Sequence, residues 1–180
     1  PLITSTKSME FDGSDERMII QDDSSLQLSG EEATFTFWAK LDSISDGDQK
    51  FIAKGQTSGS SLSAYQIRAN DDSLYFQFYN GTWRSSVVHN YFRDTDWHNV
   101  TITLYSNNYA YFYRDGVLMN TSGSDMSAGI DANTGELFFG CRQNLAEFLD
   151  GKMTEVGIYN RALTSLEVAS LYNQGMPTNL

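Results

Sequence analysis

The stretch A-T-F-T-F-W-A-K-L, residues 33–41, decides the fold class of this 180-residue chain. Phe35, Phe37 and the apolar residues that follow at every second position lie on one side of an extended chain, because side chains alternate along a β-strand. Thr36, Trp38 and Lys40 lie on the other side. A strand with one apolar face packs that face against a second sheet, so the stretch predicts a strand of a β-sandwich.

The same alternation recurs elsewhere in the chain, most clearly over residues 74–79 and 97–105, and clusters of Gly, Ser, Asn and Asp separate the segments. Asn80-Gly81 and Asp115-Gly116 are hairpin-turn signals. Further strands are expected over Met9–Phe11, Arg17–Ile20, Lys50–Lys54, Tyr65–Ala69, Tyr109–Arg114, Val117–Asn120, Glu136–Cys141 and Lys152–Tyr159. The chain is therefore predicted to be all-β, with two antiparallel sheets.

One segment near the C-terminus breaks the β pattern. Leu166, Ala169 and Leu171 recur at helical spacing, and Thr164 with Glu167 forms a capping box at the start of the segment. Gly175 provides a stop signal at its end. We therefore expect one short helix over residues 164–174.

Domain organisation follows from the position of the two prolines. Pro1 and Pro177 lie at the extremities, so no proline-rich linker divides the chain. We expect one domain over residues 1–180, with its core over about residues 9–175 and a flexible tail at residues 176–180.

Charge and composition exclude several classes of protein. The chain has 12 Lys and Arg against 23 Asp and Glu, a net charge of -11, which disfavours nucleic acid and anionic membranes as partners. Neutral sugars and cations fit this charge better. Cys141 is the one cysteine, so no intramolecular disulfide forms, and we expect its side chain to be buried. No apolar run is long enough to span a membrane, and the first residues show no signal-peptide pattern.

Several motifs, in the same order, are similar to those of a known family. They are M-E-F-D-G-S-D-E at residues 9–16, F-T-F-W-A-K at 35–40, W-H-N-V at 97–100, Y-R-D-G at 113–116, and L-D-G-K followed by E-V-G-I-Y-N-R-A-L-T at 149–164. Together they resemble laminin-G-like, concanavalin A-like jelly-roll domains, whose pentraxin members end in a similar strand and helix. The resemblance implies a jelly roll with one concave sheet open to solvent. It does not specify function, because this fold hosts lectins, glucanases, adhesion modules and structural domains.

Glycan binding is the first function to consider. Sugars stack their apolar CH faces on aromatic rings, while amides and carboxylates bind their hydroxyl groups. Outward positions and the 80–96 stretch supply such side chains, although these residues can equally cover the wet face of a sheet. The ligand-binding residues we predict are Trp38, Tyr75, Gln77, Tyr79, Trp83, Arg84, His89 and Tyr91.

Calcium is the second candidate ligand. Carboxylates and carbonyls bind hard cations, and members of the resembled family often carry calcium in loops at the sheet edge. The resemblance points to the Asp-Gly motifs at Asp12 and Asp150, with Asp15 nearby, because the first and last strands of such folds lie close together. The alternative is that these acids are solvated turn residues.

Glycoside hydrolysis is the third reading, because glucanases share the resembled fold. Such enzymes carry two carboxylates on alternate residues of one central strand. Glu10 and Asp12 show this spacing, but they belong to the first strand, and the central strands carry no acid pair. His98 continues the inward line of Val100, which favours a buried, hydrogen-bonded histidine over a zinc ligand.

These observations lead to two functional expectations. The first is a non-catalytic recognition module that binds carbohydrate or a cell-surface glycan, assisted by a calcium ion. The second is a virion component, such as a capsid-decorating or fibre module, whose aromatic residues contact capsid or other virion proteins. Either function places the chain on a virion or an extracellular surface.

Overall fold

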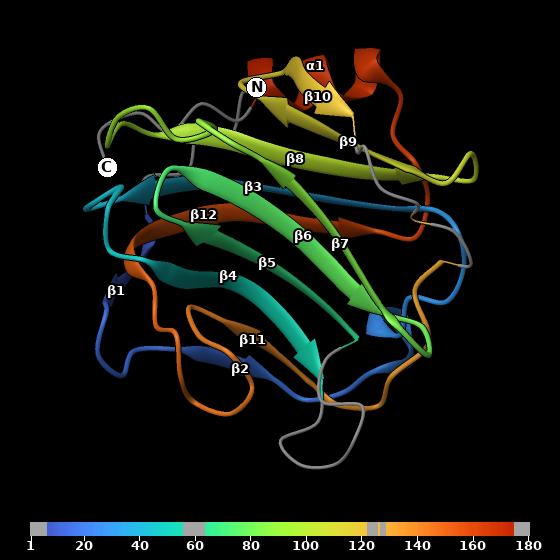
Figure 1. Cartoon of the computed structure of the whole chain (residues 1–180), viewed down its shortest axis with the longest axis horizontal. Coiled ribbons are helices and arrows are strands. Elements are labelled where there is room, and N and C mark those ends of the chain that lie inside the picture. Colours follow the sequence, from blue (N-terminus) through green and yellow to red (C-terminus); the bar gives the residue numbers. More distant parts are fainter. Residues whose placement is uncertain (1–6, 56–63, 122–125, 127–128, 175–180) are drawn as a thin grey trace.

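The computed structural model describes residues 7–55, 64–121, 126 and 129–174, which form two packed six-stranded sheets (Figure 1). All paired strands are antiparallel. The first sheet has the order β1 (Met9–Asp12), β12 (Asp150–Tyr159), β3 (Ala33–Leu41), β8 (His98–Tyr105), β9 (Tyr109–Arg114) and β10 (Val117–Thr121). The second has the order β2 (Met18–Ile20), β11 (Glu136–Phe139), β4 (Asp48–Gly55), β5 (Tyr65–Asn70), β6 (Ser73–Tyr79) and β7 (Trp83–Val88). The predicted all-β sandwich is confirmed.

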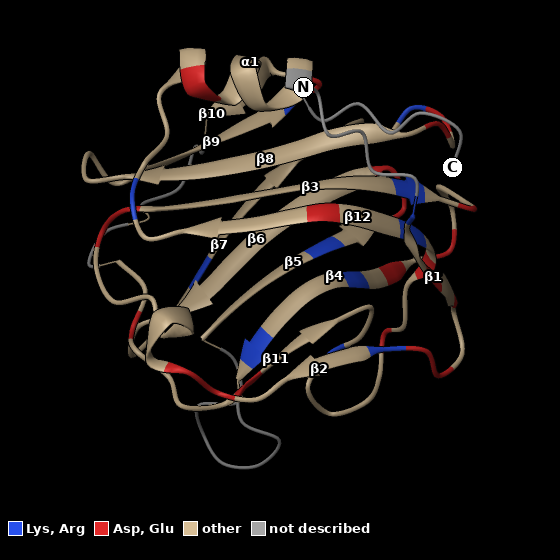
Figure 2. Ribbon diagram, turned by 180° about the vertical axis from the view of Figure 1, so that it is seen from behind, with Lys and Arg blue, Asp and Glu red and all other residues tan. Residues whose placement is uncertain are grey.

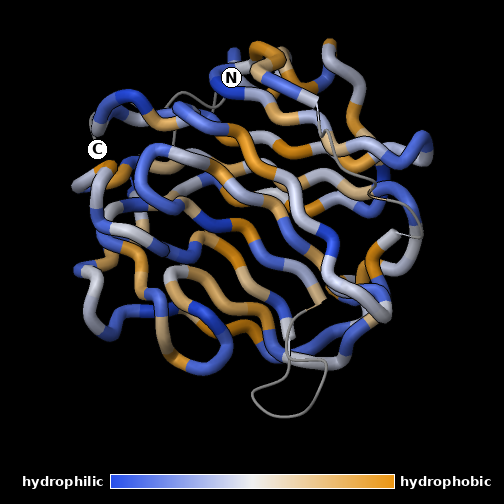
Figure 3. The backbone as a smooth tube through the Cα atoms, viewed as in Figure 1, coloured by the Kyte–Doolittle hydropathy of each residue, from blue (hydrophilic) through white to orange (hydrophobic). Residues whose placement is uncertain are grey.

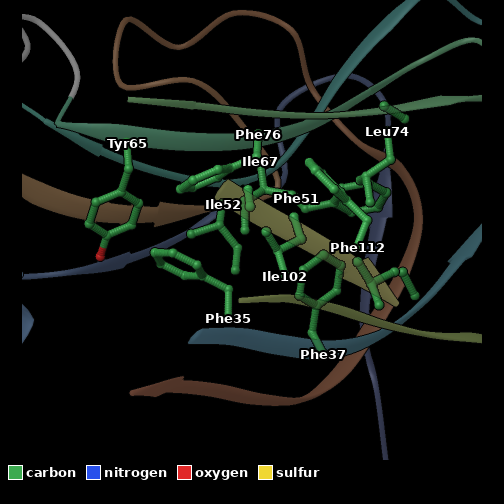
Figure 4. Packing of buried hydrophobic residues seen from close by; sticks show 14 of the residues in the cluster. Phe35, Phe37, Phe51, Ile52, Tyr65, Ile67, Leu74, Phe76, Ile102 and Phe112 are labelled. Carbon is green, nitrogen blue, oxygen red and sulfur yellow. The ribbon is translucent and has the colours of Figure 1, made fainter. Parts of the chain in front are cut away.

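The core lies between the two sheets and is rich in phenylalanine (Figure 4). Phe35 of β3 reaches across to the second sheet, where its ring centroid lies 4.9 Å from that of Tyr65 and 5.5 Å from that of Phe76. Hydrophobic and hydrophilic residues alternate along the strands (Figure 3), which is the pattern expected from residues 33–41. Each buried aromatic side chain of this size stabilises the fold by about 2–3 kcal/mol through removal from water.

Among the strands of the described residues, only β7 was not predicted from the sequence. The Asn80-Gly81 hairpin exists as expected, since Tyr79 pairs with Trp83 across it. The returning strand, however, places Arg84 and Ser86 opposite the core residues Phe78 and Phe76. Because two of its inward positions are polar, β7 shows no alternation of apolar and polar residues.

The second predicted hairpin is also present and joins β9 to β10. Asp115 and Gly116 both have positive φ, 54° and 75°, as a two-residue turn with the twist of the flanking strands requires. A side chain at Gly116 would lie 3.1 Å from Cβ of Tyr172 in the C-terminal helix. This turn is therefore packed against the helix.

Helix α1 (Ser165–Gln174) lies on the outer side of the first sheet, the side that points away from the second sheet (Figure 1). The expected capping box is present: the Glu167 amide donates to Oγ1 of Thr164 at 3.3 Å, and the Thr164 amide donates to the Glu167 carboxylate at 2.8 Å. Of the three residues at helical spacing, Leu171 packs against the sheet, but Leu166 is 82% exposed. Val168, which is not one of the three, is fully buried against the sheet.

Three other expectations concern Cys141, the C-terminal tail and membrane-spanning helices. Cys141 is buried, as expected. Gly175 and the predicted flexible tail lie outside the described residues. Among the described residues, no helix is both long enough and apolar enough to cross a membrane.

The orientation of helix α1 gives a stability prediction. Replacing Val168 by alanine removes buried methyl groups from the helix–sheet interface, so the free energy of unfolding should fall by about 1–2 kcal/mol. The matched control, Leu166→Ala, removes an exposed side chain and should change it by less than about 0.5 kcal/mol. Urea unfolding followed by circular dichroism measures both. Equal losses in the two variants would contradict the observed helix orientation.

Candidate functional site

The outer face of the second sheet carries a group of aromatic and polar side chains on three neighbouring strands. Leu74, Phe76 and Phe78 of β6 point into the core, so Tyr75, Gln77 and Tyr79 point away from it. The strand register places their cross-strand partners on the same face: Arg68 opposite Tyr75, Gln66 and Ser85 on either side of Gln77, and Trp83 opposite Tyr79. We call these seven residues the β5–β7 face.

Arg68 links the β5–β7 face together. Its guanidinium carbon lies 4.0 Å from the centroid of the Tyr75 ring, within the range of a cation–π contact. Its Nε donates to Oε1 of Gln77 at 3.1 Å, and Nη1 donates to Oδ1 of Asp48 at 2.7 Å. Arg68 therefore fixes the orientation of an aromatic ring and of an amide at the same time.

Gln77 lies at the centre of this face and makes three hydrogen bonds within the protein. Its Oε1 accepts from Arg68 and also from Nε2 of Gln66 at 2.9 Å, while its Nε2 donates to Oγ of Ser85 at 3.1 Å. The side chain is half-buried. Its main role is thus to hold its neighbours in place.

Trp83 and Tyr79 form the open aromatic end of the β5–β7 face. Their ring centroids lie 5.6 Å apart with an interplanar angle of 66°, so the edge of one ring meets the face of the other. Trp83 is 45% exposed, which leaves a large part of the indole accessible to a ligand. An exposed tryptophan beside ordered polar groups matches what sugar recognition requires.

A charged network borders the face on β4 (Figure 2 shows the basic residues of β4 and β5). Lys50 is almost completely buried, and its Nζ lies 3.2 Å from Oδ1 of Asp48 and 2.5 Å from Oε2 of Glu147. Burial lowers the pKa of Lys50, and the Glu147 carboxylate opposes this shift. Arg142 also pairs with Glu147, at 3.0 Å. The network ties the 140–149 segment to β4.

The structure removes Trp38 from the predicted binding set. Its side chain does point away from the core, as expected, but helix α1 covers it. The Trp38 and Tyr172 rings stack with centroids 5.6 Å apart, and only 2% of Trp38 is exposed. Asn99 and Thr103, which lie on the same outer face of the first sheet, are buried as well.

Tyr91 is also inaccessible to a ligand. It is fully buried, and its hydroxyl group donates to the backbone carbonyl of Tyr113 at 2.5 Å. Burial raises the pKa of its phenol well above the ordinary value. Tyr91 therefore anchors the segment between β7 and β8 to the first sheet.

Two further predicted residues lie away from the β5–β7 face. Arg84 directly follows Trp83, so its side chain points to the opposite side of β7. It pairs with the core residue Phe78, so this is the inward side. His89 follows the other end of β7, and its Nδ1 lies 3.1 Å from Oγ of Ser73.

The structure thus brings together Tyr75, Gln77, Tyr79 and Trp83, and adds Gln66, Arg68 and Ser85. Alternation within the predicted strand 65–69 would have identified Gln66 and Arg68.

The predicted metal ligands gather at one end of β1 and β12. Asp12 and Asp150 are directly paired across these strands, and the Gly13 amide donates to the Leu149 carbonyl at 2.8 Å. Carboxylate oxygens of Asp12, Asp15 and Glu16 lie within 4.8 Å of one another. Of the predicted ligands, Asp12 and Asp15 belong to this group together with Glu16, whereas Asp150 lies beside it as the strand partner of Asp12.

The carboxylates at this end influence each other's protonation. A side-chain hydrogen bond with Glu16 lowers the pKa of Asp12, and the same contact raises the pKa of Glu16. Burial, followed by the charges of Asp42, Asp46 and Asp12, raises the pKa of Asp150. Such crowding of negative charge is relieved when a divalent cation binds, so the residues present fit a hard cation.

The acid pair Glu10 and Asp12 does not lie in a cleft of the second sheet. Both belong to β1, which is the edge strand of the first sheet, and Glu10 pairs with Lys152 at 3.2 Å. In the described strands at the centre of either sheet, no two alternate residues are both acidic. These described central strands thus carry no acid pair of the kind that glucanases use.

The chain belongs to the concanavalin A-like lectin/glucanases superfamily, because a laminin G-type model of that superfamily matches residues 12–169. No curated protein sequence matches the chain. The superfamily assignment agrees with the resemblance inferred from the motifs, and with the observed two-sheet architecture.

Solved structures of botulinum neurotoxin domains share this fold. The serotype D ligand-binding domain, solved with N-acetylneuraminic acid, has 16% identity and a TM-score of 0.71 over 91% of this chain and 41% of its own. The serotype G binding domain has 13% identity and a TM-score of 0.69, over 90% and 41%. The receptor-binding domain of the mosaic serotype C/D has 16% identity and a TM-score of 0.70, over 94% and 44%. The chain spans less than half the length of each of these neighbours.

Proposed function

We propose that the chain is a non-catalytic carbohydrate-recognition module and that its ligand lies on the β5–β7 face. The observation that carries this proposal is the accessible Trp83–Tyr79 pair beside the hydrogen-bonded group of Arg68, Gln77 and Ser85. The outer face of the first sheet is a poorer candidate, since helix α1 buries its tryptophan. The serotype D neurotoxin domain that was solved with N-acetylneuraminic acid supports a sugar as the class of ligand.

The chemistry of the face indicates how a sugar would bind. One pyranose ring stacks its CH groups on the indole of Trp83, and the hydroxyl groups of the next ring meet Ser85 and the remaining N–H donors of Arg68. One face of Tyr75 is already occupied by Arg68, so Tyr75 contributes its hydroxyl group more than its ring. The net charge of -11 favours uncharged over anionic glycans.

The function is tested by screening the chain on a glycan array and then measuring the affinity for the best neutral glycan by calorimetry. Trp83→Ala should weaken binding by at least about tenfold, equivalent to about 1.4 kcal/mol, because the stacking surface is lost. The matched control is Tyr109→Ala, which removes an aromatic ring of similar exposure, 47%, from the first sheet and should leave the affinity unchanged. Absence of binding to any glycan, or equal losses in both variants, would overturn the proposal.

We also propose that Asp12, Asp15 and Glu16, with Asp150 beside them, hold a calcium ion. The ion would neutralise the crowded carboxylates and order the turn that connects β1 with β2. None of the ligands of this ion belongs to the β5–β7 face. The ion would therefore assist recognition indirectly, by stabilising the rim of the sandwich.

The calcium proposal is tested by thermal unfolding with calcium and with a chelator. Calcium should raise the melting temperature of the wild-type chain, because a ligand that binds only the folded state stabilises it. The double change Asp12→Asn and Asp15→Asn should abolish this rise. The control Glu10→Gln removes an acid from the same strand and should retain it. A wild-type melting temperature that is the same with calcium and with a chelator would refute the site.

A second function, as a structural component of a virion, is supported by one feature of the second sheet. Its edge strand β2 exposes Met18, Ile19 and Ile20 by 40–42% each, and consecutive exposed apolar residues on an edge strand suit a protein–protein contact. A component that acts through such contacts should associate with itself or with capsid proteins. Analytical ultracentrifugation that shows a monomer at high concentration, together with failure to bind capsid proteins, would rule out this function.

A further inference from the structure

His98 lies at the start of β8, and each of its ring nitrogens faces a carboxylate from a different segment. Nδ1 lies 2.8 Å from Oδ2 of Asp115, in the β9–β10 turn. Nε2 lies 3.0 Å from Oδ1 of Asp94, in the segment between β7 and β8. Only 8% of His98 is exposed, so water replaces neither contact easily.

This geometry is satisfied only when the ring carries two protons. A neutral imidazole has one N–H donor and one nitrogen lone pair, whereas the imidazolium has two donors. With a neutral ring, one of the two carboxylates would face a lone pair at hydrogen-bond distance, which is repulsive. The arrangement therefore belongs to the protonated form of His98.

The two carboxylates are not held equally well. Asp115 is fixed by backbone bonds: the Asn99 amide donates to its Oδ1 at 2.9 Å, and its own amide donates to the Asn99 carbonyl at 2.9 Å. The Asp94 side chain is 51% exposed, and its one further bond among the described residues is a local one from the Asp96 amide, at 2.9 Å. When the ring loses one proton, the contact with Asp94 is the one that breaks.

The charged and titratable groups around His98 determine which residues respond to a change in its protonation. Besides Asp94 and Asp115, these are Arg114 of β9, whose charge acts on Asp94, and the buried phenol of Tyr91. Arg114 holds the Tyr91 carbonyl, and the Phe92 amide donates to the Asp72 carbonyl at 2.8 Å. Residues 91 and 92 therefore remain anchored, and only residues 93–96 depend on His98.

We propose that His98 is a pH-sensitive clamp: its imidazolium ties residues 93–96 to the β9–β10 turn, and loss of one ring proton releases residues 93–96 while the turn stays in place. This device is independent of glycan binding, since none of its residues belongs to the β5–β7 face. It couples the order of one rim segment to the protonation of His98.

The direction of the pH effect follows from the two carboxylates. The contact with Asp115 raises the pKa of His98 above 6.5, opposed by burial and reinforced by Asp94. The stabilisation by the clamp is therefore fully present below pH 6.5 and is lost as the pH rises through the higher pKa of the folded state.

Two measurements on the full chain test the clamp. Nuclear magnetic resonance titration of the ring protons should give a pKa above 6.5 for His98. Hydrogen exchange, expressed as a protection factor, should show the Asp96 amide, which donates to Oδ1 of Asp94, losing protection as the pH rises through that value, while the amide of Asp115 keeps its protection. Asp94→Asn should lower the pKa of His98 and remove the pH dependence of the Asp96 amide protection.

The matched control is His89→Gln, which removes the other histidine of the chain and should leave both the titration of His98 and the protection of the Asp96 amide unchanged. A wild-type His98 that titrates at or below 6.5 would overturn the proposal. Protection of the Asp96 amide that does not follow the titration of His98 would overturn it as well. Both results come from the wild-type chain, so the test does not depend on the folding of a variant.

Discussion

The contact of Phe35 with Tyr65 and Phe76 joins the two sheets, and the rest of the structure depends on packing of this kind. Because side chains alternate along each strand, burial of one set of residues between the sheets fixes which set points outward. Burial of Leu74, Phe76 and Phe78 is thus the reason that Tyr75, Gln77 and Tyr79 share one outer face. The candidate site is a consequence of core packing, not a separate device.

The two outer faces differ because helix α1 covers only one of them. On the first sheet the helix stacks Tyr172 on Trp38 and buries Val168, which makes this face a second, smaller core. On the second sheet the 140–149 segment covers the β4 side through Lys50 and Glu147, and Trp83 at the far side of β6 stays exposed. Accessibility, more than residue type, distinguishes the tryptophan proposed to bind sugar from the one that stabilises the fold.

Alternation in the sequence was sufficient to predict most of the fold, and its failures have physical causes. Residues 33–41 have one strictly apolar face, and the strand was predicted with its observed bounds. β7 was missed because Arg84 and Ser86 occupy inward positions opposite core residues. At the site, alternation correctly gave the side of the sheet on which Trp38 lies, but it carries no information about a helix 130 residues later that packs over it. Alternation likewise carries no information about Tyr91, whose buried hydroxyl group donates to the backbone carbonyl of Tyr113 in β9.

Chemical-shift mapping tests directly whether ligand recognition takes place on the β5–β7 face. Backbone amide resonances would be followed while the best neutral glycan from an array is added to the chain. If the ligand lies on this face, the shifts will concentrate on residues 66–68, 75–79 and 83–85. Shifts that instead concentrate on β3 and β8 beneath helix α1, or at the β1–β12 end alone, would contradict it.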